Sequence, residues 1–223
     1  MSNPYFQFKQ FTVWHDKCAM KVGTDGVLLG AWTSVQGAHS ILDVGTGTGL
    51  VALMLAQRSL PNTNIVALEI DEAAAEQAKE NIVRSPWKKQ IEVVQTDFRK
   101  YQSPEKFDVI VSNPPYFVDS LGCPDQQRNS ARHNDSLTYE ELLEGVTGLL
   151  TENGTFTIVI PMDVADRVKM IASEKKLQAV RQLNVITKPG GIPKRTLITF
   201  SFSNQECIVE AVSYTHLTLP TNR

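Results

Sequence analysis

The strongest constraint on the fold of this chain is an apolar run that leads through a glycine-rich turn into a second apolar run. Residues 40–44 (SILDV) are typical of a buried strand, residues 45–49 (GTGTG) of a turn, and residues 50–56 (LVALMLA) of a helix. Glycine lets the backbone approach a ligand closely, and the amino end of a helix favours electron-rich groups. The order therefore predicts a strand–turn–helix unit that binds a ligand at its turn.

Strand-like and helix-like segments alternate along most of the chain. Besides residues 40–44, the sequence predicts strands near 64–69, 91–95, 107–112, 155–160, 178–186 and 196–203. Predicted helices near 50–56, 71–84, 138–150 and 163–175 separate most of them. This alternation favours a parallel sheet with helices on both faces, whereas the last two strands have no helix between them. We therefore predict an α/β fold, a Rossmann-like, doubly wound, mainly parallel seven-stranded sheet with an antiparallel edge strand.

Two helix starts carry capping signals. Thr138, with Glu141 three residues later, predicts a capping box for the helix near 138–150. Thr24 or Asp25 is the predicted cap of a helix that ends near Trp32. Ahead of that helix, residues 5–22 alternate aromatic and polar side chains, which indicates a short hairpin or an edge strand rather than a helix.

Composition limits the classes of partner. The chain has 223 residues and a formal net charge of −2, so one sizeable domain is expected and a strong uniform attraction to nucleic acid is excluded. Affinity for RNA would have to come from local basic patches. The candidates are Arg84/Lys88/Lys89, Arg128/Arg132/His133 and Lys188/Lys194/Arg195. Each has the pattern of a solvated face, except the second, which lies in the long polar segment 117–136 and could overhang a site.

Cysteine usage and hydropathy exclude several further classes. The three cysteines are widely spaced and form no C-x-x-C pair, so neither a disulfide framework nor a zinc site is indicated, and we expect no metal. The first residues lack a signal-peptide pattern, and no apolar run approaches about 18 residues. We therefore expect a cytoplasmic protein with no membrane partner. A monomer is favoured, although the sequence does not fix the oligomeric state.

The tetrapeptide Asn113-Pro114-Pro115-Tyr116 follows the strand near 107–112, at its carboxyl end, where open α/β sheets bind their ligands. Asn113 and Pro114 offer two neighbouring carbonyl acceptors, which suit the two hydrogens of a planar amine. Tyr116 could stack on the attached ring. The alternative is a Pro-Pro turn after a strand, with Asn as the turn former.

An acid at the end of the next strand points to the kind of cofactor. Glu69 lies 24 positions after Gly45, close to the ~20 expected for an acid that binds a ribose diol. The spacing G-x-G-x-G differs from the dinucleotide fingerprint G-x-G-x-x-G, so a pyrophosphate cradle is disfavoured. We predict an adenosine-type cofactor, and a nicotinamide oxidoreductase is the competing class.

The pattern D-x-G-x-G-x-G (residues 43–49) followed by N-P-P-Y resembles the S-adenosylmethionine-dependent methyltransferases that modify planar amino groups. The resemblance implies that the loop glycines pass under the methionine part of the cofactor and that Glu69 holds the ribose. It also assigns Asp97 to the adenine amine, with Phe98 beside the ring. The alternative for Asp97 is a helix or turn cap, but its position at the end of a strand-like run favours the cofactor role. The full set of cofactor residues so expected is Lys21, Thr24, Asp43, Gly45, Thr46, Gly47, Gly49, Glu69, Ile70, Asp97, Phe98 and Asn113.

A closer resemblance concerns the acceptor. Residues 8–13, 16–32, 81–82, 85–87 and 131–132 are similar to the bacterial valine-tRNA adenine-N6 methyltransferases. The resemblance implies a tRNA partner, Asn113, Pro114 and Tyr116 as catalytic residues, and an acceptor surface made of Pro115, Arg128, Arg132 and His133. Two alternatives stay open: an enzyme that methylates a protein glutamine amide or another nucleic-acid amine, and a cofactor-binding RNA chaperone.

These expectations divide the chain into three parts. Residues 1–36 form an N-terminal extension that packs on the cofactor site, and residues 37–212 form the S-adenosylmethionine-dependent methyltransferase domain. Residues 213–223 (SYTHLTLPTNR) fit no element of the pattern and are predicted to be a non-native tail.

Overall fold

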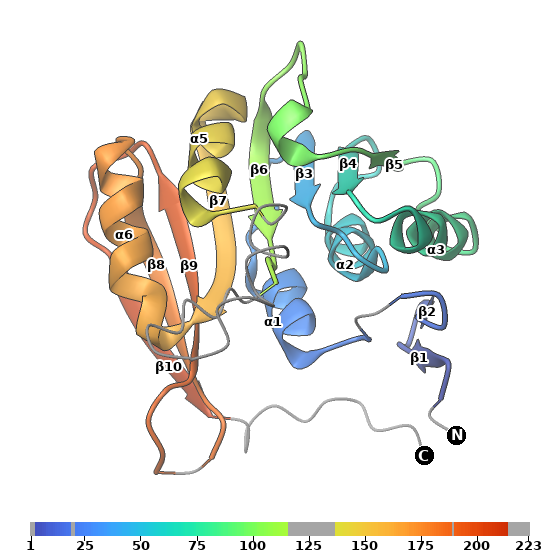
Figure 1. Ribbon diagram of the computed structural model, residues 1–223, viewed down its shortest axis with the longest axis horizontal. Coiled ribbons are helices and arrows are strands. Elements are labelled where there is room, and N and C mark those ends of the chain that lie inside the picture. Colours follow the sequence, from blue (N-terminus) through green and yellow to red (C-terminus); the bar gives the residue numbers. More distant parts are fainter. Residues whose placement is uncertain (1–2, 19–20, 116–136, 189, 214–223) are drawn as a thin grey trace, which may run out of the picture.

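The computed structural model describes residues 3–18, 21–115, 137–188 and 190–213 (Figure 1). Its centre is an eight-stranded sheet with the order β10-β8-β9-β7-β6-β3-β4-β5. The strands are β3 (Ser40–Val44), β4 (Asn64–Glu69), β5 (Ile91–Gln95), β6 (Phe107–Ser112), β7 (Leu150–Pro161), β8 (Gln178–Ile186), β9 (Arg195–Ser201) and β10 (Ile208–Ser213).

The sheet is mainly parallel, as predicted. Strands β5, β4, β3, β6 and β7 pair in parallel, and β9 runs antiparallel to both β7 and β8. The predicted antiparallel pairing near the end of the sheet that holds β8 and β9 is confirmed. The predicted count of seven strands was one too few, because β10 pairs in parallel with β8. Four of its six residues are exposed although most of them are apolar, because β10 is the edge strand of the sheet. Pairing with β8, including the ion pair between Arg181 and Glu210 at 3.0 Å, holds it in place.

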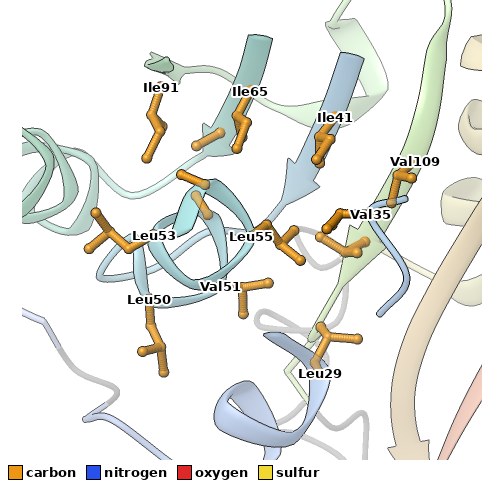
Figure 2. Close-up of a cluster of buried hydrophobic side chains, with 14 of the residues drawn as sticks. Leu29, Val35, Ile41, Leu50, Val51, Leu53, Leu55, Ile65, Ile91 and Val109 are labelled. Carbon is orange, nitrogen blue, oxygen red and sulfur yellow. The ribbon is translucent and has the colours of Figure 1, made fainter. Parts of the chain in front are cut away.

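Helices cover both faces, which confirms the doubly wound arrangement. One apolar cluster joins α1 (Thr24–Trp32), α2 (Leu50–Arg58) and the end of α3 (Glu72–Val83) to one face of the sheet. Figure 2 shows α2 facing Ile41, Ile65 and Ile91 of three adjacent strands. The second cluster joins α5 (Tyr139–Leu149) and α6 (Ala165–Glu174) to the other face. Neighbouring strand residues divide between the two clusters, because successive side chains of a strand point to opposite faces.

The helix starts agree with the sequence in one case and differ in another. The capping box of α5 is confirmed: the Glu141 amide donates to Thr138 Oγ1 at 3.2 Å, and the Thr138 amide donates to Glu141 Oε2 at 2.8 Å. The expected side-chain cap of α1 was wrong, because Gly23 is the N-cap and Thr24 is already the first helical residue. Glycine in an extended conformation starts the helix there without a side-chain bond.

The predicted amino-terminal hairpin is confirmed as β1 (Tyr5–Gln7) and β2 (Thr12–Trp14). It lies along α3, with the Phe11 and Trp87 rings 5.6 Å apart at one end and the Lys17 amide donating to Gln77 Oε1 at the other. The buried Asn81 joins the two elements, accepting from the Trp14 amide at 2.9 Å and donating to the Trp14 carbonyl at 2.8 Å. Its Nδ2 also donates to the Thr48 carbonyl at 2.9 Å, so one side chain ties the hairpin to the glycine turn.

We expect Asn81→Ala to lower the free energy of unfolding by about 2–4 kcal/mol, because it leaves the part-buried amide and carbonyl of Trp14 and the buried carbonyl of Thr48 without their partner. Urea unfolding followed by tryptophan fluorescence measures this. Asn64→Ala, at the exposed first residue of β4, is the matched control and should be near neutral. An Asn81 variant as stable as the control would show that the bonds from its carboxamide to the hairpin and the glycine turn do not stabilise the fold.

Candidate active site

The glycine turn after β3 is held in a conformation that its sequence dictates. Gly45, Gly47 and Gly49 have φ values of +74°, +57° and +79°, a region that side chains strongly disfavour. The Gly45 and Thr46 amides both donate to the Leu68 carbonyl at 2.9 Å, which fastens the turn to the end of β4. Gly49 then caps α2, so the turn brings its backbone and the amino end of a helix to the carboxyl edge of the sheet.

Asp43 lies beneath this turn rather than on its surface. The carboxylate is buried, and its Oδ2 accepts from Thr46 Oγ1 at 2.6 Å and from the Ala52 amide at 3.2 Å. Burial raises the pKa of Asp43 from 3.8 to about 7, against the lowering effect of these two hydrogen bonds. The residue therefore orders the turn from below.

This burial makes stability depend on pH. In the unfolded chain the Asp43 carboxyl ionises near its ordinary pKa of 3.8, whereas the folded protein keeps it protonated up to about 7. The contribution of Asp43 to the free energy of unfolding is therefore fully present below pH 3.8. It falls by about 4 kcal/mol as the pH rises from 3.8 to 7. Asp43→Asn should flatten this part of the pH profile in urea unfolding, and the exposed Asp163→Asn should not. If the free energy of unfolding depended on pH equally in both variants, the raised pKa of Asp43 would be contradicted.

Glu69 at the end of β4 faces the turn. Its Oε2 accepts from the Gly47 amide at 2.7 Å, and its Oε1 accepts from the Ile70 amide at 2.9 Å and the Asp71 amide at 3.0 Å. A carboxylate has about four acceptor positions, so one remains for a ligand hydroxyl. If both hydroxyls of a ribose bind, the Gly47 amide must give up its bond to Oε2.

Asp97 follows β5 and is fixed by its neighbour Arg99. The guanidinium of Arg99 forms a two-point contact with the carboxylate, at 3.0 Å and 2.7 Å, and the Arg99 amide also donates to it. These bonds hold the pKa of Asp97 below its ordinary value. Asp97 also begins the short 3₁₀ helix η1 (Phe98–Lys100), so the turn-cap alternative is observed beside any cofactor role. Phe98 is buried against Gly145 of α5, where a β-carbon would come within 2.5 Å of the ring.

Asn113 and Pro114 follow β6 at the same edge of the sheet. The strand is fastened there by the Ser112 hydroxyl, which donates to the Val44 carbonyl at 2.9 Å. Figure 1 shows α1 beside the carboxyl end of β6, and a β-carbon on Gly26 would lie 3.9 Å from Asn113 Nδ2. Glycine at position 26 therefore leaves α1 close enough to border the Asn113 side chain.

These groups surround one cavity of about 310 Å³ at the carboxyl edge of β3, β4, β5 and β6. The expected site residues that line it are Gly45, Gly47, Glu69, Ile70, Asp97, Phe98, Asn113, Pro114 and Pro115. Apolar walls with three carboxylates, those of Glu69, Asp71 and Asp97, fit a ligand that combines a flat ring, a diol and positive charge. S-adenosylmethionine has these three features.

Other expected site residues lie elsewhere. Five cofactor candidates do not line the cavity: Lys21, Thr24, Asp43, Thr46 and Gly49. Four acceptor-side candidates, Tyr116, Arg128, Arg132 and His133, lie outside the described residues. Their roles stay predictions, as do the three domain boundaries.

The structure adds cavity residues that the sequence reasoning missed. Cys18, just after the hairpin, lines the cavity, and burial together with Glu69 and Asp71 raises the pKa of its thiol to about 11. Arg99 and Asp71 are the other charged additions. The only sequence signal that Arg99 belongs to the site was its position two residues after Asp97. The sequence contained no signal for Cys18.

Within the described residues, no helix is long and apolar enough to cross a membrane. The same part of the chain contains no group of three or more histidine, cysteine, aspartate or glutamate side chains that could hold a metal ion.

Comparison with known proteins agrees with this geometry. The family model described as the methyltransferase small domain matches residues 22–187. A protein of Bacteroides thetaiotaomicron, named tRNA1(Val) (adenine(37)-N6)-methyltransferase, is 80% identical over 210 residues, covering 94% of this chain and 89% of that relative. A Yersinia pestis protein of the same name is 44% identical over 216 residues, covering 96% of this chain and 85% of its own length.

Solved structures share the fold at low identity. The glycopeptide N-methyltransferase MtfA in complex with S-adenosylmethionine has a TM-score of 0.60 at 11% identity, covering 81% of this chain and 93% of that one. TrmN from Thermus thermophilus has a TM-score of 0.55 at 19% identity, covering 79% of this chain and 47% of that one. The fold, the family model and the relatives thus agree, and the chain belongs to the methyltransferase small domain family, in the group of the tRNA1(Val) (adenine(37)-N6)-methyltransferases.

Proposed function

We propose that this protein transfers a methyl group from S-adenosylmethionine to the exocyclic N6 amine of adenine 37 in a valine tRNA. The observation that carries the proposal is the meeting of Asn113 and Pro114 with Glu69 and Asp97 around one cavity. The first pair suits an amino group and the second pair suits an adenosine. The names of the relatives supply the identity of the acceptor nucleotide.

The cofactor side of the proposal uses groups whose orientation is already fixed. Glu69 accepts from the ribose hydroxyls, and Asp97, held by Arg99, accepts from the adenine amine. The carboxylates also favour the positive charge that the cofactor carries. When bound, S-adenosylmethionine supplies an electrophilic methyl group on its sulfonium sulfur.

The acceptor side needs no strong base. The lone pair of an adenine amine is delocalised into the ring, which makes the nitrogen a poor nucleophile. Asn113 Oδ1 and the Pro114 carbonyl can accept one N–H each, which favours the pyramidal, electron-rich nitrogen that attacks. Such contacts contribute about 2–4 kcal/mol each where they act in the transition state. The positively charged nitrogen formed by transfer then loses one proton to solvent.

Access to the site requires the adenine to leave its stack. A base inside an RNA stack cannot bring its amine to a cavity at a sheet edge, so the nucleotide has to turn outward. We propose that Tyr116 replaces part of the lost stacking, and that Pro115, Arg128, Arg132 and His133 contact the RNA. Because bacterial tRNA is a cytoplasmic molecule, the proposal includes a cytoplasmic location.

The second candidate function is methylation of a glutamine amide in a protein. A primary amide is also planar and also has two N–H hydrogens, so Asn113 and Pro114 suit it equally. A direct test supplies labelled S-adenosylmethionine with unmodified bulk tRNA and with peptide-release factor in parallel. We expect label in the tRNA, and label confined to the protein would reject the RNA acceptor.

A further inference from the structure

The connection between β8 and β9, described at residues 187–188 and 190–194, lies at the same edge of the sheet as the cavity. We refer to these residues as the β8–β9 loop. Because β9 is antiparallel to both β7 and β8, the carboxyl end of β8 shares an edge with the carboxyl ends of β6 and β7. Asn113 also lies at that edge, directly after β6.

A chain of contacts connects the loop to the acceptor side of the cavity. Arg195, the first residue of β9, places its Nε 3.3 Å from Asp25 Oδ2 in the first turn of α1. The next residue, Gly26, is the one whose added β-carbon would lie 3.9 Å from Asn113 Nδ2. At the root of the loop, the Lys194 amide donates to the Val185 carbonyl at 3.1 Å. The start of β9, directly after the loop, is thus connected through α1 to the side of the cavity where Asn113 lies.

The loop presents an apolar side chain between two cations. Ile192 is 80% exposed, the highest value among the exposed large hydrophobic residues of the described chain. Lys188 and Lys194 are exposed, and neither forms an ion pair with a carboxylate in the part of the chain that the structure describes. Residues 187–195 (TKPGGIPKR) contain no acid. Gly190 has φ +70°, and the Gly191 amide donates to the Lys188 carbonyl at 3.0 Å.

We propose that the β8–β9 loop is an RNA-contact surface, on which Lys188 and Lys194 bind backbone phosphates and Ile192 packs against an unstacked base of the same tRNA. The inference rests on the proposed function. Cations that alternate with an exposed apolar group match a single-stranded RNA segment, which offers phosphates and unstacked bases together. With a net charge of −2 over the whole protein, such local cations have to supply the attraction to RNA.

The test compares Lys188→Gln/Lys194→Gln with Lys106→Gln/Lys176→Gln, a control that removes two exposed lysines just before β6 and β8, at the opposite edge of the sheet. With unmodified valine tRNA transcript, the loop variant should raise KM about tenfold and flatten the slope of log(kcat/KM) against log[salt] by about 1–2, while cofactor affinity stays unchanged. A KM and a slope equal to those of the control would overturn the proposal.

Substitution of Ile192 tests the apolar contact independently of the two lysines. Ile192→Ser should raise KM several-fold with the salt slope of the wild type, whereas Ile192→Leu should behave as the wild type. A serine variant without any effect would remove the packing role of Ile192. Thermal unfolding of every variant checks that folding is intact. If the wild type methylates tRNA and the loop variants do so with the same KM and salt slope, only the loop inference fails. If the wild type transfers label only to protein, the proposed function fails as well.

Discussion

Asn113→Ala is expected to lower kcat by about 10²–10³-fold while cofactor affinity stays within a few-fold of the wild type. The side chain borders α1 and lines the cavity, and its proposed bond is to the amine that reacts rather than to the cofactor. Removal therefore costs transition-state stabilisation and leaves ground-state binding of the methyl donor almost intact. Single-turnover methyl transfer measures the first quantity, and calorimetry with S-adenosylmethionine measures the second.

The control for this variant is Asn153→Ala, at an exposed position near the start of β7, which should keep wild-type turnover. A second variant, Asn113→Asp, retains an acceptor at nearly the same place and should recover part of the activity. If Asn113→Ala kept most of its turnover, the two-acceptor arrangement would be wrong.

Glu69→Ala is expected to weaken the binding of S-adenosylmethionine about 100-fold, because the bonds from the ribose to a charged acceptor are lost. The same change frees the Gly47, Ile70 and Asp71 amides, so part of the loss comes from the turn itself. Glu69→Gln separates the two contributions, since it keeps an oxygen and removes the charge. Calorimetry gives both affinities.

The control here is Glu72→Ala, on the exposed first residue of α3, which should leave the affinity unchanged. Unaltered binding in Glu69→Ala would remove the ribose assignment. The same experiment addresses the competing cofactor class, because tighter binding of NADH than of S-adenosylmethionine would favour an oxidoreductase.

The sequence predicted the part of the site that depends on local order. A strand, a glycine turn and a helix have to place the turn at the carboxyl edge of a parallel sheet, and Asn113 at the end of β6 has to meet it there. The alternation of strand-like and helix-like apolar segments along the chain likewise predicted most strands and helices to within a few residues of their observed bounds. These features are set by neighbours in the sequence, which is why a single chain reveals them.

The parts that escaped prediction depend on contacts between distant segments. β10 has four exposed residues among six, and its pairing with β8 fixes its place at the edge of the sheet. Cys18 reaches the cavity because Asn81 and Gln77 hold the preceding hairpin against α3, a relation that no local pattern contains. Asp43 has the appearance of a ligand residue in the motif, yet its two internal hydrogen bonds place it below the turn.

The most direct test of the proposed reaction is nucleoside mass spectrometry of a valine tRNA transcript after incubation with the protein and S-adenosylmethionine. A second transcript carries guanine in place of adenine 37. The account predicts one N6-methyladenosine per tRNA in the first transcript and none in the second. Methylation that persists in the second transcript, or a methyl group on a different atom of adenine, would contradict it.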